Sequence, residues 1–133
     1  MTLGVRGIVI NPRDEVLLVR HTYVNGWHLP GGGVERGESL QTSLARELAE
    51  EGNIVLDEEP KLHGIFFNRE NSQRDHVAVY FVRRFRQSGP RPPDREIAEA
   101  RFFARDALPE GIDRASRERI EEVLNGAPLR RVW

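Results

Sequence analysis

Three glutamates, Glu47, Glu50 and Glu51, follow one another closely in a stretch where helical periodicity is plain. At 100° per residue, a helix places their three carboxylates on one face about 100° wide. Like charges that close repel by roughly 0.2–0.5 kcal/mol per pair, and the neighbouring Arg46 cannot neutralise all three. Carboxylate oxygens are the ligands that Mg²⁺ and Mn²⁺ prefer. The spacing therefore indicates a divalent-cation site, and the alternative is a solvated acidic helix face.

The elements around these glutamates have clear boundaries. Three consecutive glycines, 31–33, stop any regular structure before the helix, and Ser39 is a typical N-cap. Gly52 and Asn53 both accept left-handed backbone angles, so the helix is predicted to end near Glu51. Apolar positions at four-residue spacing support the helix between these limits: Leu40, Leu44 and Leu48.

The order of these residues resembles the signature of a known family, the Nudix hydrolases. The family pattern is G-x5-E-x7-R-E-U-x-E-E-x-G-U, in which U is a bulky aliphatic residue, and residues 32–54 follow it. The matching positions are Gly32, Glu38, Arg46, Glu47, Leu48, Glu50, Glu51 and Ile54. The segments 27–30 and 96–109 are also similar to the family. One position departs from the pattern, because the late glycine is Asn53; the turn is expected either to form there or to close one residue early on Gly52.

The resemblance implies hydrolysis of a pyrophosphate linkage in a nucleoside diphosphate joined to another moiety, with Mg²⁺ or Mn²⁺ as cofactor. Glu47, Glu50, Glu51 and the carbonyl of Gly31 would be metal ligands. Glu47, or else Glu50, would orient or deprotonate the attacking water. Glu96 is a further candidate ligand, with a solvated loop charge as the alternative. The residues implied to be structural are Gly32, Glu38 and Arg46, the last two as an ion pair.

Residues for substrate recognition are less specific in the sequence. Arg6 and Arg20 are candidate phosphate contacts, with ordinary surface positions as the alternative. Trp27 and Phe67 are candidates for stacking on a base, with core packing as the alternative. Family markers for ADP-ribose and diadenosine polyphosphates are absent at residues 70–72. The substrate expected is a nucleoside triphosphate or related nucleotide derivative; the alternatives are a nucleotide sugar, a dinucleoside polyphosphate or a non-catalytic nucleotide sensor.

The fold expected is an α/β (α+β) sandwich, the Nudix fold, with a mixed sheet flanked by helices. Apolar runs at 3–10 and 15–20 are predicted to form a hairpin, and a helix is predicted over 114–125. Further strands are predicted at 26–29, 54–56, 61–68, 76–86 and 99–104.

Length and composition limit the classes of protein. A chain of 133 residues predicts one domain, 1–133. The absence of cysteine excludes disulfides and thiolate metal sites. A net charge of −1 argues against general nucleic-acid binding, and no apolar run is long enough to cross a membrane. With no signal-peptide pattern, a cytoplasmic location is expected; the resemblance also allows a homodimer. Five of the 21 acidic residues lie between positions 35 and 51.

Overall fold

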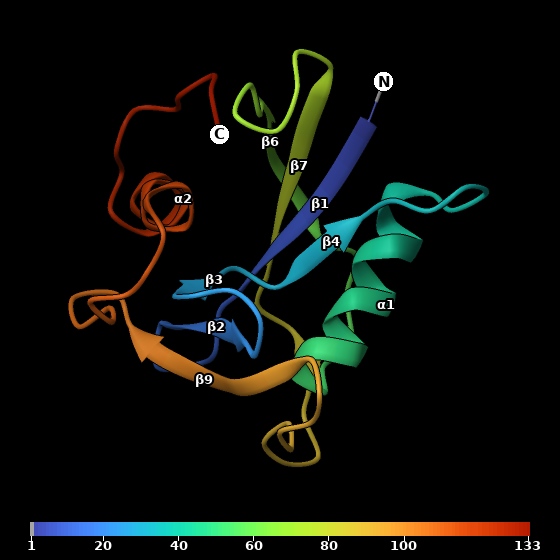
Figure 1. The fold of residues 1–133 in the computed structure, drawn as a ribbon. Helices are drawn as coiled ribbons and strands as arrows, with labels where there is room; N and C mark the ends of the chain where they lie inside the picture. The colour runs from blue at the N-terminus through green and yellow to red at the C-terminus, as the bar shows by residue number, and fades with distance from the viewer. Residues whose placement is uncertain (1) are drawn as a thin grey trace.

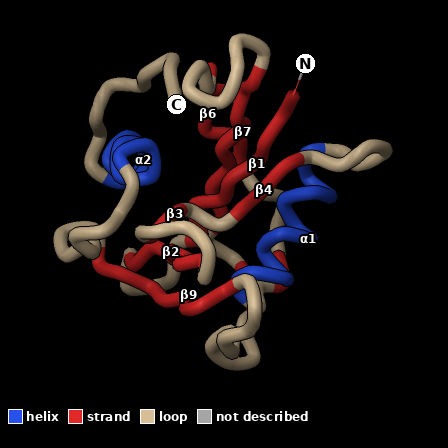
Figure 2. Tube along the Cα trace, viewed as in Figure 1, coloured by secondary structure: helices blue, strands red, loops and turns tan. Residues whose placement is uncertain are grey.

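The computed structural model describes residues 2–133, which form nine strands and two helices (Figure 1). The helices are α1 (Leu40–Gly52) and α2 (Arg114–Leu124). The strands are β1 (Thr2–Val9), β2 (Glu15–His21), β3 (Trp27–His28), β4 (Gly31–Gly33), β5 (Val55–Leu56), β6 (Lys61–Phe67), β7 (Asp75–Val82), β8 (Phe85–Arg86) and β9 (Ile97–Ala104). The two helices lie on opposite sides of the strands (Figures 1 and 2).

The strands form three sheets, and the largest is mixed. Its order is β4-β1-β7-β6, with β1 parallel to β7 and antiparallel to β4. The second sheet has the order β3-β2-β9 and is antiparallel, and the short strands β5 and β8 pair with each other. The predicted sandwich with a mixed sheet and flanking helices is confirmed.

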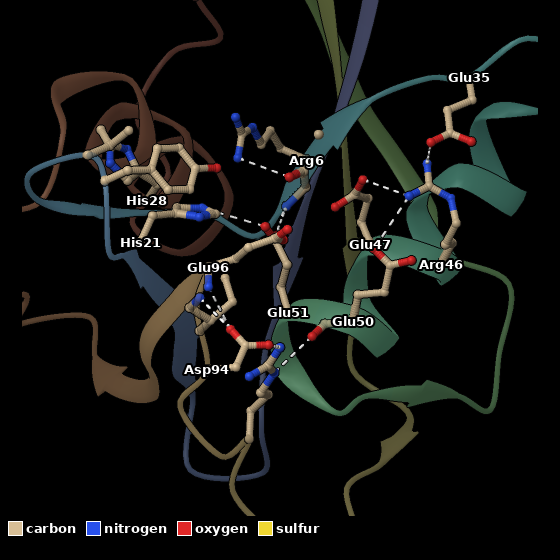
Figure 3. A pocket seen from close by; sticks show the side chains of 16 residues that line it. Arg6, His21, His28, Glu35, Arg46, Glu47, Glu50, Glu51, Asp94 and Glu96 are labelled. Carbon is tan, nitrogen blue, oxygen red and sulfur yellow. Dashed lines mark hydrogen bonds and ion pairs between the residues drawn. The ribbon is translucent and has the colours of Figure 1, made fainter.

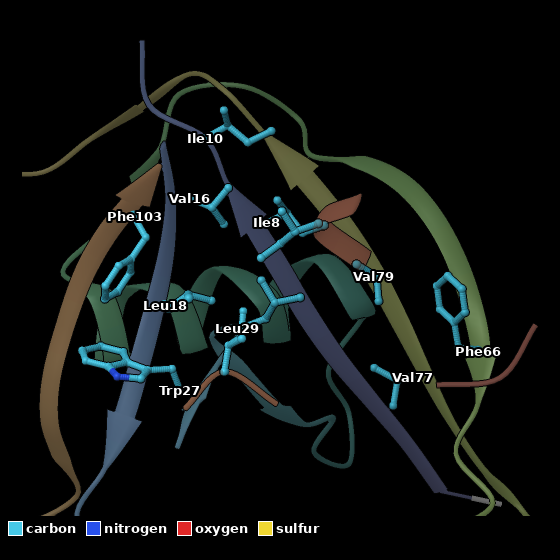
Figure 4. Packing of buried hydrophobic residues seen from close by; sticks show 12 residues of the cluster. Ile8, Ile10, Val16, Leu18, Trp27, Leu29, Phe66, Val77, Val79 and Phe103 are labelled. Carbon is cyan, nitrogen blue, oxygen red and sulfur yellow. The ribbon is translucent and has the colours of Figure 1, made fainter. Parts of the chain in front are cut away.

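Hydrophobic side chains fill the space on both faces of β1 and β2. One cluster, seen in Figure 4, includes Ile8, Leu18, Leu29 and Phe103 and reaches Ile120 of α2. The other cluster lies against α1 and contains Val5, Val9, Leu17, Leu44 and Leu48. Strands covered on both faces have near-continuous apolar sequences, which explains the unbroken runs at 3–10 and 15–20.

The predicted hairpin of 3–10 with 15–20 is wrong. One isolated bridge, between Ile10 and Val16, joins the two segments where they enter and leave the turn. From there they diverge, because β1 pairs with β7 over eight residues and β2 pairs with β9 over seven. Two long ladders with distant strands replace one local ladder.

The predicted long strand 76–86 is also divided. The backbone N–H groups of Arg83 and Arg84 both donate to the Glu58 carboxylate at 3.1 Å, instead of to a neighbouring strand. The chain turns there, so β7 ends at Val82 and β8 pairs with β5. In the described part of the chain, no helix has both the length and the apolar character to cross a membrane.

Candidate active site

Local interactions fix both ends of the glutamate-bearing helix. The Ser39 hydroxyl accepts a hydrogen bond from the Thr42 N–H at 3.1 Å, which is the predicted N-cap. Leu44 and Leu48 are fully buried and hold the helix against the sheet. Glu47, Glu50 and Glu51 follow on the adjoining side of the helix and line the cleft.

The turn after the helix closes on Asn53, which settles the question raised by the missing glycine. Asn53 has a left-handed backbone (φ 57°), and its N–H donates to the Ala49 carbonyl. Its side-chain amide also donates to the Gly89 carbonyl at 3.1 Å, a contact that a glycine could not make. Gly52 is required for another reason, since a Cβ there would lie 2.7 Å from the Leu17 side chain.

The glycine loop packs against the strand and the helix too closely for side chains. Gly31 pairs with Arg6 of β1 and has φ +151°, and a Cβ there would lie 2.0 Å from the Val5 carbonyl oxygen. A Cβ on Gly32 would lie 2.7 Å from a Glu47 carboxylate oxygen. The two glycines thus allow the loop and the first glutamate to share one small space.

A cleft of about 830 Å³ lies between this loop, α1 and the segment before β9 (Figure 3). It gathers most of the residues that the sequence nominated, namely Arg6, Gly31, Gly32, Arg46, Glu47, Glu50, Glu51 and Glu96. Its volume falls within the range of small-molecule sites, roughly 300–1,000 Å³. The polar lining favours a charged ligand.

The three glutamates differ in burial. The side chain of Glu51 is 10% exposed, and one of its oxygens accepts the Gly31 N–H at 2.7 Å. Burial raises the pKa of Glu51 to about 7, although that hydrogen bond acts in the opposite direction. Burial also raises the pKa of Glu47, against the effect of the adjacent Arg46. Glu50 extends toward solvent, with 59% of its side chain exposed.

The donor set suits a hard divalent cation. Three carboxylates border one cleft, and buried carboxylates with raised pKa values are the groups that a cation would stabilise as anions. Among residues 2–133, no three of the acidic or histidine side chains already converge as a ligand cluster. The Gly31 carbonyl faces Arg6, whose guanidinium donates to it at 3.4 Å and to the Leu29 carbonyl at 2.9 Å. Binding a cation would thus require the carboxylates of Glu47, Glu50 and Glu51 to turn toward one point.

Glu38, which is outside the cleft lining, forms a two-pronged ion pair with Arg46, which is part of it. The guanidinium donates to both Glu38 oxygens, at 2.8 and 2.9 Å, and also to Glu47 at 2.9 Å. The guanidinium holds the pKa of Glu38 at about 2. Arg46 therefore connects the loop before the helix to a candidate metal ligand.

We expect Glu38→Gln to lower the free energy of unfolding at neutral pH. The variant should also lose less of that free energy than the wild type when the pH falls. The folded-state pKa of Glu38 lies below its usual 4.5, so the pair stabilises the fold above about pH 4.5 and is lost as the pH falls toward 2. Urea titrations from pH 7 to pH 3 measure this. Glu35→Gln is the matched control, since Glu35 contacts Arg46 only at 3.8 Å and is 70% exposed. Equal urea midpoints for the two variants at pH 7 would contradict the expectation.

Three of the candidate substrate contacts lie outside this cleft. Arg20 pairs with Glu99 at 3.5 Å and lies over the Trp27 ring. Trp27 is 9% exposed and packs edge-on against Phe103 in the core. Phe67 contacts His76 and the C-terminal segment. Arg6 is the only one of the four candidates that the structure brings to the cleft.

The segment before β9 supplies a further wall. Glu96 is exposed at its end, beside Asp94, whose carboxylate accepts the N–H groups of Glu96 and Ile97 at 2.8 Å. Arg91 donates to Asp94 at 2.6 Å and to the Glu50 carbonyl at 2.9 Å. Sequence reasoning passed over Arg91 and Asp94, because a proline-rich stretch gives no period from which to place them.

Sequence reasoning also missed His21 and Tyr23, which line the cleft at the end of β2. The His21 ring lies 3.5 Å from the Glu51 carboxylate, and burial lowers the pKa of its imidazole. His21 Nδ1 is buried and has no hydrogen-bond partner among residues 2–133. Strand alternation was the available signal, since it places His21 on the face opposite Arg20.

Comparison with known proteins identifies the family. The model of the NUDIX domain matches residues 1–123, so the chain belongs to the Nudix family. Within that family the chain is a Nudix pyrophosphohydrolase, as its MutT-like relatives and structural neighbours support. Members of the family generally use divalent metal ions.

Individual relatives agree with this assignment. A MutT-like protein of Streptomyces ambofaciens is 28% identical over 95% of this chain and 79% of its own length. A diphosphoinositol polyphosphate phosphohydrolase 2 of Rattus norvegicus is 43% identical over 52% of this chain and 38% of its own. A Bacillus subtilis protein provisionally named an 8-oxo-dGTP diphosphatase is 44% identical over 38% of this chain and 34% of its own length. The crystal structure of a MutT NUDIX hydrolase from Burkholderia pseudomallei superposes with a TM-score of 0.77, 26% identity, and coverage of 92% and 97%.

Proposed function

We propose that the protein hydrolyses a pyrophosphate linkage in a nucleoside triphosphate or a related nucleotide derivative, with Mg²⁺ or Mn²⁺. The observation that carries the proposal is the meeting of Glu47, Glu50 and Glu51 with the Gly31 loop in one cleft. The provisional name of the Bacillus subtilis relative, an 8-oxo-dGTP diphosphatase, supports a nucleoside triphosphate as substrate.

Each cleft residue has a proposed task. A bound divalent ion neutralises charge on phosphate oxygens and makes water a better nucleophile. The ligands that would hold it are Glu47, Glu50 and Glu51, with the Gly31 carbonyl and Glu96. Glu47 would accept a proton from water as the water oxygen bonds to phosphorus; the bond from phosphorus to the bridging oxygen breaks, and the phosphate that keeps this oxygen leaves.

Arg6 is proposed to bind a substrate phosphate. It is the candidate arginine that lines the cleft, and its guanidinium already bonds two carbonyls there. Its planar fork suits phosphate oxygens.

A second candidate substrate is a diphosphoinositol polyphosphate, which carries no base. The relative from Rattus norvegicus favours it. The third candidate is a nucleotide sensor without turnover, and the departure from the family pattern at Asn53 is the one feature of the sequence that favours it. That residue closes the helix with a left-handed backbone, so the departure no longer favours a sensor.

We expect a substrate panel to decide among these functions. The panel contains ATP, dGTP, 8-oxo-dGTP, ADP-ribose, a nucleotide sugar, diadenosine tetraphosphate, capped RNA and a diphosphoinositol polyphosphate. Each is incubated with Mg²⁺ or Mn²⁺, and phosphate-containing products are identified. Nucleoside triphosphates should turn over fastest, EDTA should reduce turnover to background, and added Mg²⁺ should restore it. Turnover of the inositol compound alone would contradict the nucleotide assignment, and no turnover of any substrate would favour the sensor.

A further inference from the structure

Tyr23 is an exposed aromatic residue at the rim of the cleft. Its side chain lines the same cleft as the three glutamates, yet 72% of the residue is exposed. The chain has one other tyrosine, Tyr80, which is only 4% exposed. Val24, the next residue, also lines the cleft and is 45% exposed. Apolar surface of this kind beside a polar cleft is typical of a ligand contact.

The loop that carries Tyr23 is held at both ends. At its start, the Thr22 N–H donates to the Glu96 carbonyl at 2.9 Å, and the Thr22 hydroxyl donates to the Arg95 carbonyl. At its end, the Trp27 N–H donates to the Gly111 carbonyl at 2.8 Å. A ring on a loop held in this way loses little conformational entropy when a ligand covers it.

The His21 ring lies between the Tyr23 ring and the Glu51 carboxylate. It lies 5.4 Å from the Tyr23 ring, centroid to centroid, and 3.5 Å from the Glu51 carboxylate. One imidazole therefore separates the aromatic ring from the candidate metal ligands. A nucleotide likewise carries one ribose between its base and its first phosphate.

We propose that Tyr23 is a stacking platform for the nucleobase of the substrate, with the phosphates directed to Glu47, Glu50 and Glu51. This inference rests on the proposed function, since it requires a nucleotide substrate. Stacking accepts any base, because every base has a π-face. The platform therefore predicts that the cleft distinguishes nucleotides from phosphate compounds without a base, more than one base from another.

The test compares Tyr23→Ala, which removes the ring, with Tyr23→Phe, which keeps it. Ile65→Ala is the control, because Ile65 is a 53% exposed apolar residue on β6, away from the cleft lining. Steady-state kinetics with Mg²⁺ are measured for ATP and dGTP. Inorganic tripolyphosphate is used as the base-free probe, as a substrate or as a competitor. Calorimetric titration with a methylene-bridged ATP analogue measures affinity directly.

Loss of the ring should raise KM and Kd for nucleotides by about 5- to 150-fold, the range of base–aromatic stacking, with little change in kcat. Tyr23→Phe and Ile65→Ala should match the wild type, and tripolyphosphate should bind all four proteins equally. Unchanged nucleotide KM in Tyr23→Ala, an equal loss for tripolyphosphate, or an equal loss in Tyr23→Phe would overturn the platform alone. A wild-type protein that hydrolyses no nucleotide would overturn both the platform and the proposed function.

Discussion

Glu51→Gln is expected to lower activity by about 100-fold or more and, in the absence of metal, to make the protein more stable. The loss of activity follows from its proposed role, since changes even behind a metal ligand cost about 10- to 100-fold. The gain in stability follows from burial. When this side chain ionises, its charge is only 10% exposed, and within residues 2–133 the Gly31 N–H is the one hydrogen-bond donor to it.

The sign of the stability change comes from the pKa of Glu51. Burial raises that pKa from its ordinary 4.5 to about 7 in the folded protein. The folded state therefore disfavours the ionised form, and this carboxyl lowers the free energy of unfolding as the pH rises from about 4.5 to 7. At pH 8 this pKa shift lowers the free energy of unfolding by roughly 3 kcal/mol. Glutamine does not ionise, so the Glu51→Gln variant is free of this cost. A site that is costly when empty is typical of function taking precedence over stability.

Urea titrations in EDTA at pH 5 and pH 8 check this expectation, followed by titrations in Mg²⁺. The wild type should gain stability from Mg²⁺ by about 2.7 kcal/mol at one hundred times the dissociation constant, and Glu51→Gln should gain much less. Glu50→Gln is the matched control on the same helix: it should lose activity without the gain in stability, because Glu50 is 59% exposed. Wild-type activity in Glu51→Gln would exclude Glu51 as a ligand.

Gly31→Ala should damage both the fold and the activity. The added Cβ would lie 2.0 Å from the Val5 carbonyl oxygen and 2.8 Å from Arg6 Cα, and both are backbone atoms of the central strand β1. The backbone there also has φ +151°, which side-chain-bearing residues rarely adopt. We expect the free energy of unfolding to fall by about 3 kcal/mol or more, which is the upper end of the cost of overpacking a core.

Gly33→Ala is the control for this substitution. Gly33 belongs to the same short strand, but a Cβ there would meet no atom of residues 2–133 within 4 Å. Thermal unfolding and steady-state kinetics of the two variants should separate clearly, with Gly33→Ala close to the wild type. Similar losses in both variants would mean that the strand tolerates no alanine at all, which would remove the particular role of Gly31.

The part of the site that sequence could predict is the part determined by local rules. The period of α1, its Ser39 cap and the turn at Asn53 involve neighbouring residues, and the structure confirms the helix to within one residue. The ion pair of Glu38 with Arg46 was implied by the resemblance and is present. Contacts between distant segments could not be predicted this way. Arg20 was nominated for the cleft because it is an arginine on the first strands, whereas its neighbour His21 lines the cleft.

Contacts between distant segments were also the part of the fold that the sequence could not predict. Arg119 is a fully buried arginine, enclosed by Glu122, Phe66 and Trp133. Its i,i+3 spacing to Glu122 is local and ordinary, whereas the two rings that enclose it come from β6 and from residue 133, far away in the sequence. The predicted hairpin failed for a related reason: apolar runs indicate a strand but not its partner.

The pairing of β1 between β4 and β7 has a consequence for synthesis of the chain. Thr2 pairs with Asp75 and Val9 with Val82 (Figure 1), so the first strand leaves the ribosome long before its parallel neighbour exists. At about 5–20 residues per second, that wait lasts several seconds. During this interval the segment that carries the glutamates has been made, but part of the cluster in which Leu44 and Leu48 pack, namely Ala78, Tyr80 and Val82 of β7, has not. Because a short helix depends on such packing, the acidic helix and its cleft become stable together, once β7 has been made.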